Sequence, residues 1–334
     1  MVMTPIGRRG FSIALGGFAF GLAGCASDDA PVPRAVALPN DSLLTPWLSL
    51  TGGWRADPRQ PLQAAPAAGP RLNFVQPVGV AAQGEVLMVA DAGARTLWRV
   101  ERGRDAMASF APFIGSGPEQ GASLQMGSDF STWVALPAEH KVVQYDARGR
   151  VQREWHDEAN AARPVVVAVP EDRSELLVAD GATAQIVRFN PLGRTLGVLA
   201  NARGHMLQSI AAMCFGPRGL YVLDRLAQQV VVLGAKGEVI EIVGENQLVQ
   251  PRAMAVDRSG RIFVADDVDQ RIKVFRGAKL LGAAGGAGGG PGRFGRIESL
   301  AVEGNMLYVA DSVNARVQVL LVAPPSMERE GPAS

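Results

Sequence analysis

The chain of 334 residues has no excess of charge of either sign. Lysine and arginine number 33 against 32 aspartates and glutamates, so the formal net charge is +1. A nucleic-acid-binding face needs a strongly basic surface that displaces the counterions condensed on the phosphates. We therefore expect no nucleic-acid partner.

Long apolar runs are absent beyond the first residues of the chain. Met1–Arg9 form a short basic region, Phe11–Leu22 are apolar, and Leu22-Ala23-Gly24-Cys25 ends the segment. Because this apolar run is too short to span a bilayer, it is typical of a cleaved export signal. Residues 1–24 are therefore predicted to be a signal peptide, and no later segment is long and apolar enough to span a membrane.

The last four residues of this leader resemble the bacterial lipoprotein box, in which the cysteine receives a diacylglycerol. The resemblance implies that Cys25 is lipidated and anchors the mature chain in a membrane of the cell envelope. Ala26 lacks the aspartate that retains such proteins in the inner membrane, which implies the outer membrane and a domain that faces the periplasm. Two alternatives stay open: an ordinary signal peptide with an unrelated cysteine, and export by either the twin-arginine route, which Arg8-Arg9 resemble, or the general route.

Cysteine is scarce, with two in the whole chain. If Cys25 is lipidated, Cys214 has no partner for an intrachain disulfide. Cys214 lies in the apolar run Ala211–Phe215, which favours a small core residue over a nucleophile.

Three further segments follow the leader. Residues 25–41 are rich in proline, alanine and aspartate without periodicity, which predicts a flexible tether. Residues 42–322 are predicted to form one folded domain, and residues 323–334 a disordered tail. The chain is expected to be a monomer.

The folded part is built from an internal repeat. A Val-Ala-Asp triplet, a polar turn and an alternating apolar run recur, as in Val89-Ala90-Asp91 followed by Thr96–Val100. The third positions of the triplets lie at 91, 136, 180, 224, 266 and 311, spaced by 45, 44, 44, 42 and 45 residues. The second copy is the weakest, because Leu136 stands in place of the aspartate.

A repeat of this length predicts a propeller blade. About 44 residues suffice for four short strands and their turns, and no helical period appears within the units. Each unit starts with a short apolar strand such as Ala253–Val256, and turns at a segment such as Asp257–Gly260 that supplies the backbone geometry of a tight hairpin. The predicted fold is all-β: a β-propeller of six blades, each a four-stranded antiparallel sheet.

The fifth unit, from Pro251 through Val264-Ala265-Asp266 to Phe275, resembles the NHL repeat, and the glycine-rich Gly285–Phe294 resembles the segment that joins blades in that family. The resemblance covers residues 42–322 and implies an NHL or TolB-like propeller. Departures are Leu136 and the absence of proline at the starts of the second, fourth and sixth units.

The ring has to close, because an open ring exposes strand edges that promote aggregation. The sixth unit ends at Val322, which leaves room for only three strands. We predict that Trp47–Thr51, followed by Gly52-Gly53, supplies the missing outer strand.

Candidate metal and phosphate sites are weak. The triplet aspartates recur once per blade, so they are expected to accept backbone hydrogen bonds in their turns and to pair with Arg95, Arg271 and Arg316, rather than to converge on a metal. The glycine-rich Gly282–Gly295 lacks the Lys-Ser/Thr ending of a P-loop. The histidines, at positions 140, 156 and 205, show no metal-ligand spacing.

If a binding face exists, propeller geometry places it where the innermost strands begin, around the central channel. Arginine and glutamine side chains there suit carboxylate, sugar or peptide-backbone ligands. The plain alternative is that the loops of this face are simply polar. The candidate ligand-binding residues are Gln76, Arg163, Gln208, Gln250 and Arg296, with Arg252 and Glu298 close behind.

These features favour a membrane-anchored, non-enzymatic scaffold that binds an envelope protein or a glycan and needs no cofactor. The alternative is a metal-dependent propeller enzyme. Relatives by fold include lyases with histidines around a metal and lactonases with a Glu/Asn/Asp set, so the alternative implies zinc or calcium in the channel. Neither set of residues is visible in the sequence, and no Gly-x-Ser-x-Gly elbow or Cys–His pair appears. We assign no catalytic residue and no metal ligand.

Overall fold

A computed structural model describes residues 43–56, 70–114, 121–199 and 206–325. All of these belong to one compact unit, Leu38–Ser334. The predicted signal peptide, Cys25 and the tether lie outside the described residues. None of the helices in the described ranges has the length and hydrophobicity of a membrane span.

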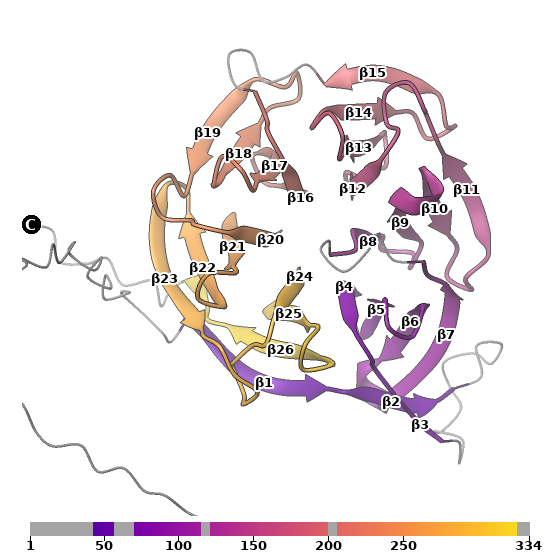
Figure 1. Cartoon of the computed structure of the whole chain (residues 1–334), viewed down its shortest axis with the longest axis vertical. Helices are drawn as coiled ribbons and strands as arrows, with labels where there is room; N and C mark the ends of the chain where they lie inside the picture. Colours follow the sequence, from indigo (N-terminus) through magenta and orange to yellow (C-terminus); the bar gives the residue numbers. More distant parts are fainter. Residues whose placement is uncertain (1–42, 57–69, 115–120, 200–205, 326–334) are drawn as a thin grey trace, which may run out of the picture. The chain divides into compact units, whose positions relative to one another are not determined.

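The unit is a ring of six antiparallel sheets that point outward from a central channel (Figure 1). This confirms the predicted six-bladed β-propeller. Each sheet contributes one strand to the channel wall. The inner strands are β4 (Pro77–Gln83), β8 (Leu124–Met126), β12 (Pro164–Ala168), β16 (Ile210–Gly216), β20 (Pro251–Val256) and β24 (Ile297–Glu303).

The remaining strands follow outward in chain order within each blade. The second strands are β5 (Val86–Asp91), β9 (Thr132–Leu136), β13 (Leu176–Asp180), β17 (Gly219–Asp224), β21 (Arg261–Asp266) and β25 (Met306–Asp311). The third strands are β6 (Thr96–Glu101), β10 (Lys141–Tyr145), β14 (Ile186–Phe189), β18 (Gln229–Leu233), β22 (Arg271–Arg276) and β26 (Arg316–Val322). The outer strands of the first five blades are β7 (Ala106–Pro112), β11 (Val151–Trp155), β15 (Thr195–Leu199), β19 (Val239–Val243) and β23 (Lys279–Gly285).

The core lies between the blades. Six apolar clusters fill the six interfaces between neighbouring sheets. In the triplet of the first blade, Val89 packs toward the sixth blade and Ala90 toward the second. Because side chains alternate between the two faces of a strand and both faces are covered, the triplets are apolar without alternation.

Each triplet aspartate ties the start of its own inner strand to the turn after its second strand. The carboxylate of Asp224 accepts the backbone N–H groups of Gln208 (2.7 Å), Ser209 (3.0 Å) and Ala227 (3.2 Å). Asp91 and Asp266 hold their own blades in the same way. The carboxylates are buried, so these hydrogen bonds replace water that the turn has lost.

Of the three arginines predicted to pair with triplet aspartates, one is confirmed. Arg316 pairs with Asp311 at 2.9 Å. Asp266 pairs instead with Lys273 at 2.7 Å, because the buried ammonium reaches the carboxylate from within the blade. Arg271 makes no ion pair with Asp266, nor does exposed Arg95 with Asp91, anywhere in the described part of the chain.

The blade that lacks the aspartate has the shortest inner strand in the described ranges. Its β8 pairs with β9 only from Leu124 onward. The residues just before β8 contact the first blade instead, where the N–H of Ala122 donates to the carbonyl of Val78 at 2.8 Å. Gly79 makes room for this contact, since a Cβ there would lie 2.7 Å from the Ala122 oxygen.

The ring closes through β1 (Leu44–Leu50), which pairs antiparallel with β26 as the outer strand of the sixth blade. This confirms the predicted closure, although the strand begins three residues earlier than expected. The chain continues as β2 (Gly52–Arg55), which runs parallel to β7 of the first blade, and returns as β3 (Arg71–Asn73). One segment therefore binds the outer edges of the last and the first blade (Figure 1, lower edge).

Arg102 reinforces this junction from the single turn of 3₁₀-helix η2 (Arg102–Arg104). Its guanidinium lies 5.2 Å from the ring centre of Trp47 in β1 and donates to the Tyr308 hydroxyl of the sixth blade at 3.1 Å. It also pairs with Glu85 of the first blade. A further 3₁₀ turn, η3 (Pro137–Glu139), follows β9 in the second blade.

Asp224→Ala is expected to lower the free energy of unfolding by about 2–4 kcal/mol, because buried N–H groups that lose their acceptor cost about 1–3 kcal/mol each. Chemical denaturation measures the change. Asp172→Ala removes an exposed carboxylate from the turn between β12 and β13, and its free energy of unfolding should stay close to that of wild type. Equal effects of the two substitutions would contradict the role of the triplet aspartate.

Gly52→Ala is expected to weaken ring closure by about 1–3 kcal/mol. Gly52 has a φ of +150°, and a Cβ there would lie 1.9 Å from the carbonyl oxygen of Leu72. Deleting residues 42–54 should lower the unfolding temperature further, since β26 then loses its outer partner.

The matched control is Gly290→Ala, where an added Cβ meets no atom within 4 Å. Its melting curve should superimpose on that of wild type. An unchanged melting temperature in the deletion variant would show that β1 is dispensable for closure.

Candidate ligand-binding channel

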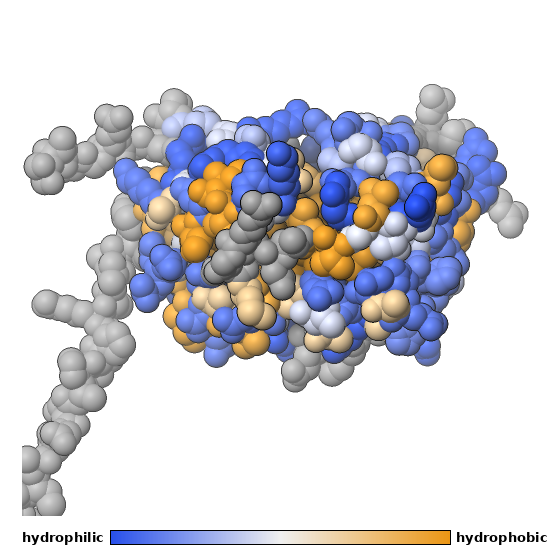
Figure 2. All heavy atoms as spheres, turned by 90° about the horizontal axis from the view of Figure 1, so that it is seen from above, coloured by the Kyte–Doolittle hydropathy of each residue, from blue (hydrophilic) through white to orange (hydrophobic). Residues whose placement is uncertain are grey.

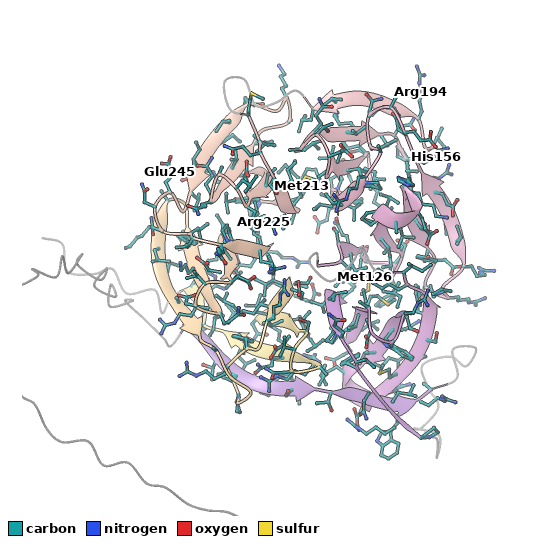
Figure 3. The ribbon with its side chains drawn as sticks, in the orientation of Figure 1. Met126, His156, Arg194, Met213, Arg225 and Glu245 are labelled. Carbon is teal, nitrogen blue, oxygen red and sulfur yellow. The ribbon has the colours of Figure 1, made fainter. Side chains whose placement is uncertain are left out.

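The inner strands of all six blades enclose a central cavity of about 1270 Å³. We call the end of the ring at which these strands begin the proximal face, and the other end the distal face. Small apolar residues such as Ala212, Ala255 and Val302 make up much of the wall. Met126 of the second blade and Met213 of the fourth blade also line it (Figure 3).

The predicted ligand-binding residues lie on the proximal face, but most of them serve the fold with their backbone. Gln76, Arg163, Gln250 and Arg296 directly precede their inner strands, and each donates its N–H to a triplet aspartate. Gln208 lies one position further out, and Ser209 occupies the equivalent place in the fourth blade. The side chains of Arg163, Gln208 and Gln250 are exposed, so a ligand-binding role for them remains a prediction.

Arg252 and Glu298 lie together in an ion-pair network between the fifth and sixth blades. Arg252 binds Asp267 at 2.6 Å and Glu298 at 3.2 Å, and Arg296 binds the other oxygen of Glu298 at 3.1 Å. Ser312 also donates to Glu298 at 3.3 Å. The sequence analysis placed three of these residues near one another but missed Asp267 and Ser312, each of which directly follows a triplet aspartate.

Burial raises the pKa of the Glu298 carboxyl above its ordinary value of 4.5. Arg252 and Arg296 oppose this shift, whereas the nearby charge of Asp267 adds to it. The network is therefore a balance between desolvation and charge pairing, and the arginines here are held by carboxylates of the same protein.

An apolar arc, which sequence reasoning missed, lies beside this network on the proximal face. Leu226, Val268 and Val313 stand two residues after the aspartates of the fourth, fifth and sixth blades and are 64%, 56% and 70% exposed. Exposed Val249 lies beside the turn that carries Leu226, because its carbonyl accepts a hydrogen bond from the side-chain amide of Gln228 in that turn at 2.6 Å. The signal was present in the alignment of the units, where the other blades carry glycine or alanine at this position.

One segment narrows the proximal mouth. Gly121, which precedes β8, lies so close to the sixth blade that a Cβ would fall 2.3 Å from the carbonyl oxygen of Glu298. The chain therefore passes in front of β4 and reaches across the edge of the first blade. Only glycine fits there.

A different apolar area lies on the outer wall, at Leu196 and Val198 of β15 and Ile240 of β19. Figure 2 views the ring edge-on from this side and shows apolar patches separated by polar residues. Gly197, with a φ of +125°, distorts β15. An irregular outer strand is a poor template for pairing with another chain.

The remaining candidates do not form a site. Cys214 lines the channel on β16, and its enclosed thiol has a pKa raised by burial to about 12. His140 contacts the carbonyl of Ala162 at 2.6 Å, His156 lies at the outer edge of the ring (Figure 3), and His205 is outside the described residues. Among the residues placed by the structure, no three histidine, cysteine or carboxylate side chains are arranged to hold a metal.

Comparison with known proteins agrees with the blade structure. No protein-family model matches the chain. Among curated proteins, NHL-repeat-containing protein 4 of Homo sapiens is 34% identical over 94 residues, which are 28% of this chain and 76% of that protein. The chain belongs to the NHL-repeat family.

Solved structures share the fold of this NHL propeller at low sequence identity. A protein of unknown function from Bacteroides thetaiotaomicron is 13% identical with a TM-score of 0.59, covering 82% of this chain and 74% of its own. Virginiamycin B lyase from Staphylococcus aureus is 9% identical with a TM-score of 0.52, covering 75% and 96%. Kuenenia stuttgartiensis hydrazine synthase is 11% identical with a TM-score of 0.55, covering 75% and 97%.

Glu298→Gln is expected to change how the stability of this NHL propeller depends on pH. Because the folded-state pKa of Glu298 is raised, the unfolded chain loses this proton first as the pH rises, and wild-type stability falls until the folded-state pKa is passed. The glutamine variant lacks this fall. Unfolding free energies of both proteins, measured at a series of pH values upward from about 4, give the difference curve. Parallel curves would show that burial does not shift this carboxyl.

Proposed function

We propose that this NHL propeller is a membrane-anchored, non-enzymatic scaffold that binds a protein partner on its proximal face. The observation that carries the proposal is the arc of Leu226, Val249, Val268 and Val313. Leu226, Val268 and Val313 are exposed in the equivalent turns of three consecutive blades, and exposed Val249 lies beside the first of these turns. Contiguous exposed apolar residues with a polar rim mark protein-interaction sites.

The chemistry of the arc favours a protein over a glycan. Its side chains are aliphatic, and the neighbouring arginines Arg252 and Arg296 are already paired with carboxylates. Aliphatic surface gains free energy by covering apolar surface on a partner. Arg225, close to the channel, and Glu245, further out, supply charge of both signs around the arc (Figure 3).

The leader sequence supports the anchoring part of the proposal. A lipid on Cys25 would hold the domain at the outer membrane, facing the periplasm, by way of residues 25–41. In this arrangement the propeller brings its partner to the membrane surface.

The competing function is a metal-dependent lyase or lactonase with its site in the channel. This competing function is supported by the likeness to virginiamycin B lyase. At 9% sequence identity, that likeness shows a common fold and nothing more. Elemental analysis of the purified protein separates the two functions. Stoichiometric zinc or calcium, lost together with activity when a channel residue is changed, would overturn the scaffold.

Site-specific photocrosslinking in the cell envelope tests the scaffold. A photoreactive amino acid at Leu226, Val268 or Val313 should give one discrete adduct with a partner protein, identified by mass spectrometry. The photoreactive amino acid placed at Leu192, an exposed position on the distal side, serves as the matched control and should give no adduct. Cys25→Ser should release the propeller from the membrane fraction and reduce the adduct. Equal crosslinking from Leu192 and from the arc would contradict the proposal.

A further inference from the structure

The inner strands of the channel have one free edge each. They pair with the second strand of their blade on one side only, so alternate residues direct both N–H and C=O away from the blade. Val80 of β4 and Val167 of β12 are such residues, because their N–H groups bond to side chains of the preceding blade. Each lies opposite the valine of its triplet, Val89 or Val178.

Some of these free edges are capped by the preceding blade. Ser299 Oγ accepts the N–H of Val80 at 3.2 Å, and Ser123 Oγ accepts that of Val167 at 3.0 Å. Directly after β12, the Gln125 side chain accepts the N–H of Val169 at 2.7 Å and donates to its carbonyl at 2.6 Å. A polar side chain at the right position of one blade therefore closes the edge of the next.

The equivalent positions in three consecutive blades have no such cap. Met213, Met254 and Leu300 also lie opposite the triplet valines of their blades, so their N–H groups face the channel. The residues that correspond to Ser123 and Ser299 are apolar there: Val166, Ala212 and Ala253. Within the described ranges, no side chain or backbone group accepts these three N–H groups. Buried backbone donors of this kind bind water or a ligand.

The chain itself shows that such an edge accepts another segment. Ahead of β8, the backbone of Ala122 reaches the free edge of β4 and donates to the Val78 carbonyl at 2.8 Å. This contact lies inside the channel, beside the first blade. The edges of β16 and β20 border the same cavity and carry no comparable segment among the described residues. The edge of β24 is different, because Gly121 lies against the carbonyl of Glu298 there. On β20 the N–H of Val256 bonds to the Cys214 side chain, whereas that of Met254 stays open.

We propose that the channel binds an extended polypeptide segment by strand addition to the open edges of β16 and β20. The donor and acceptor groups repeat every second residue along these edges, a spacing that an extended peptide matches. Small side chains such as Ala211, Ala212 and Ala255 line this part of the wall, which leaves room for a backbone beside the strands.

The channel mouth also defines the kind of segment. Arg252, Asp267, Glu298 and Arg296 neutralise one another there, so no unpaired charge of this network attracts a charged peptide. The end of the segment that enters at this mouth is therefore expected to be neutral, with small side chains. The other end of the cavity is lined by charged residues such as Asp172, Arg173 and Asp257. This inference rests on the proposed function and names the part of the partner that enters the ring.

The test begins with random linear peptides displayed on phage, matched in length to β20 and selected on the purified propeller. The tightest peptide is then synthesised and its affinity measured for wild type and for Ala212→Ser. The serine reproduces the cap seen at Ser123 and Ser299 for the N–H group of Met254. This variant should bind about fivefold more weakly, the effect of losing one hydrogen bond. Its melting temperature should equal or exceed that of wild type.

Two controls make the result specific. Ser299→Ala opens one more edge, so it should leave the affinity unchanged or raise it. Peptides N-methylated at alternate residues should lose binding in one alternation and keep it in the other, because only one set of N–H groups faces the edge.

The outcomes separate this inference from the proposed function. If no peptide is selected, or if the selected peptide binds Ala212→Ser as tightly as wild type, strand addition in the channel is wrong. If the peptide instead loses affinity with Leu226→Ser and the arc gives crosslinks, the scaffold function is supported and strand addition in the channel is rejected. Absence of crosslinks from the arc would contradict the scaffold itself.

Discussion

The structure depends on one interaction that is repeated around the ring: a buried aspartate at the end of the second strand accepts the backbone N–H groups of the segment that enters the same blade. At Asp224 and Asp266 this carboxylate binds the two residues before the inner strand, and so fixes where that strand begins. The second blade shows the consequence of losing it. With Leu136 in its place, the start of the inner strand leaves its own blade and lies against the first.

The ring then needs an external strand to close, because a repeat protein built from incomplete ends exposes unpaired edges. The consecutive strands β1 and β2 form one segment, in which β1 pairs with the last blade and β2 with the first. Arg102 joins three parts of the chain at this point through Trp47, Glu85 and Tyr308. The closed ring holds six inner strands around one cavity, and both the apolar arc and the open strand edges follow from that geometry.

The candidate site shows how a regular scaffold acquires an individual surface. Positions that are equivalent in every blade carry different residues: serine caps an edge at Ser123 and Ser299, whereas alanine leaves it open at Ala212 and Ala253. Turns that carry glycine or alanine in three blades carry leucine or valine in the other three. Binding properties therefore arise from small departures within the repeat, while the repeat itself maintains the fold.

The sequence by itself determined the all-β class, the number of blades and the closing strand, because a repeat of constant length with Val-Ala-Asp at its centre has few ways to bury its apolar faces. It also located the proximal face. Tertiary structure alone decided that Arg252 and Glu298 pair with each other, that Lys273 rather than Arg271 meets Asp266, and that β2 continues onto the first blade. The first and the last of these contacts join different blades or distant parts of the chain, and their partners depend on how neighbouring sheets are placed against each other, which no local pattern records. Lys273 and Asp266 lie in one blade, and there the burial of the lysine side chain decides the pairing.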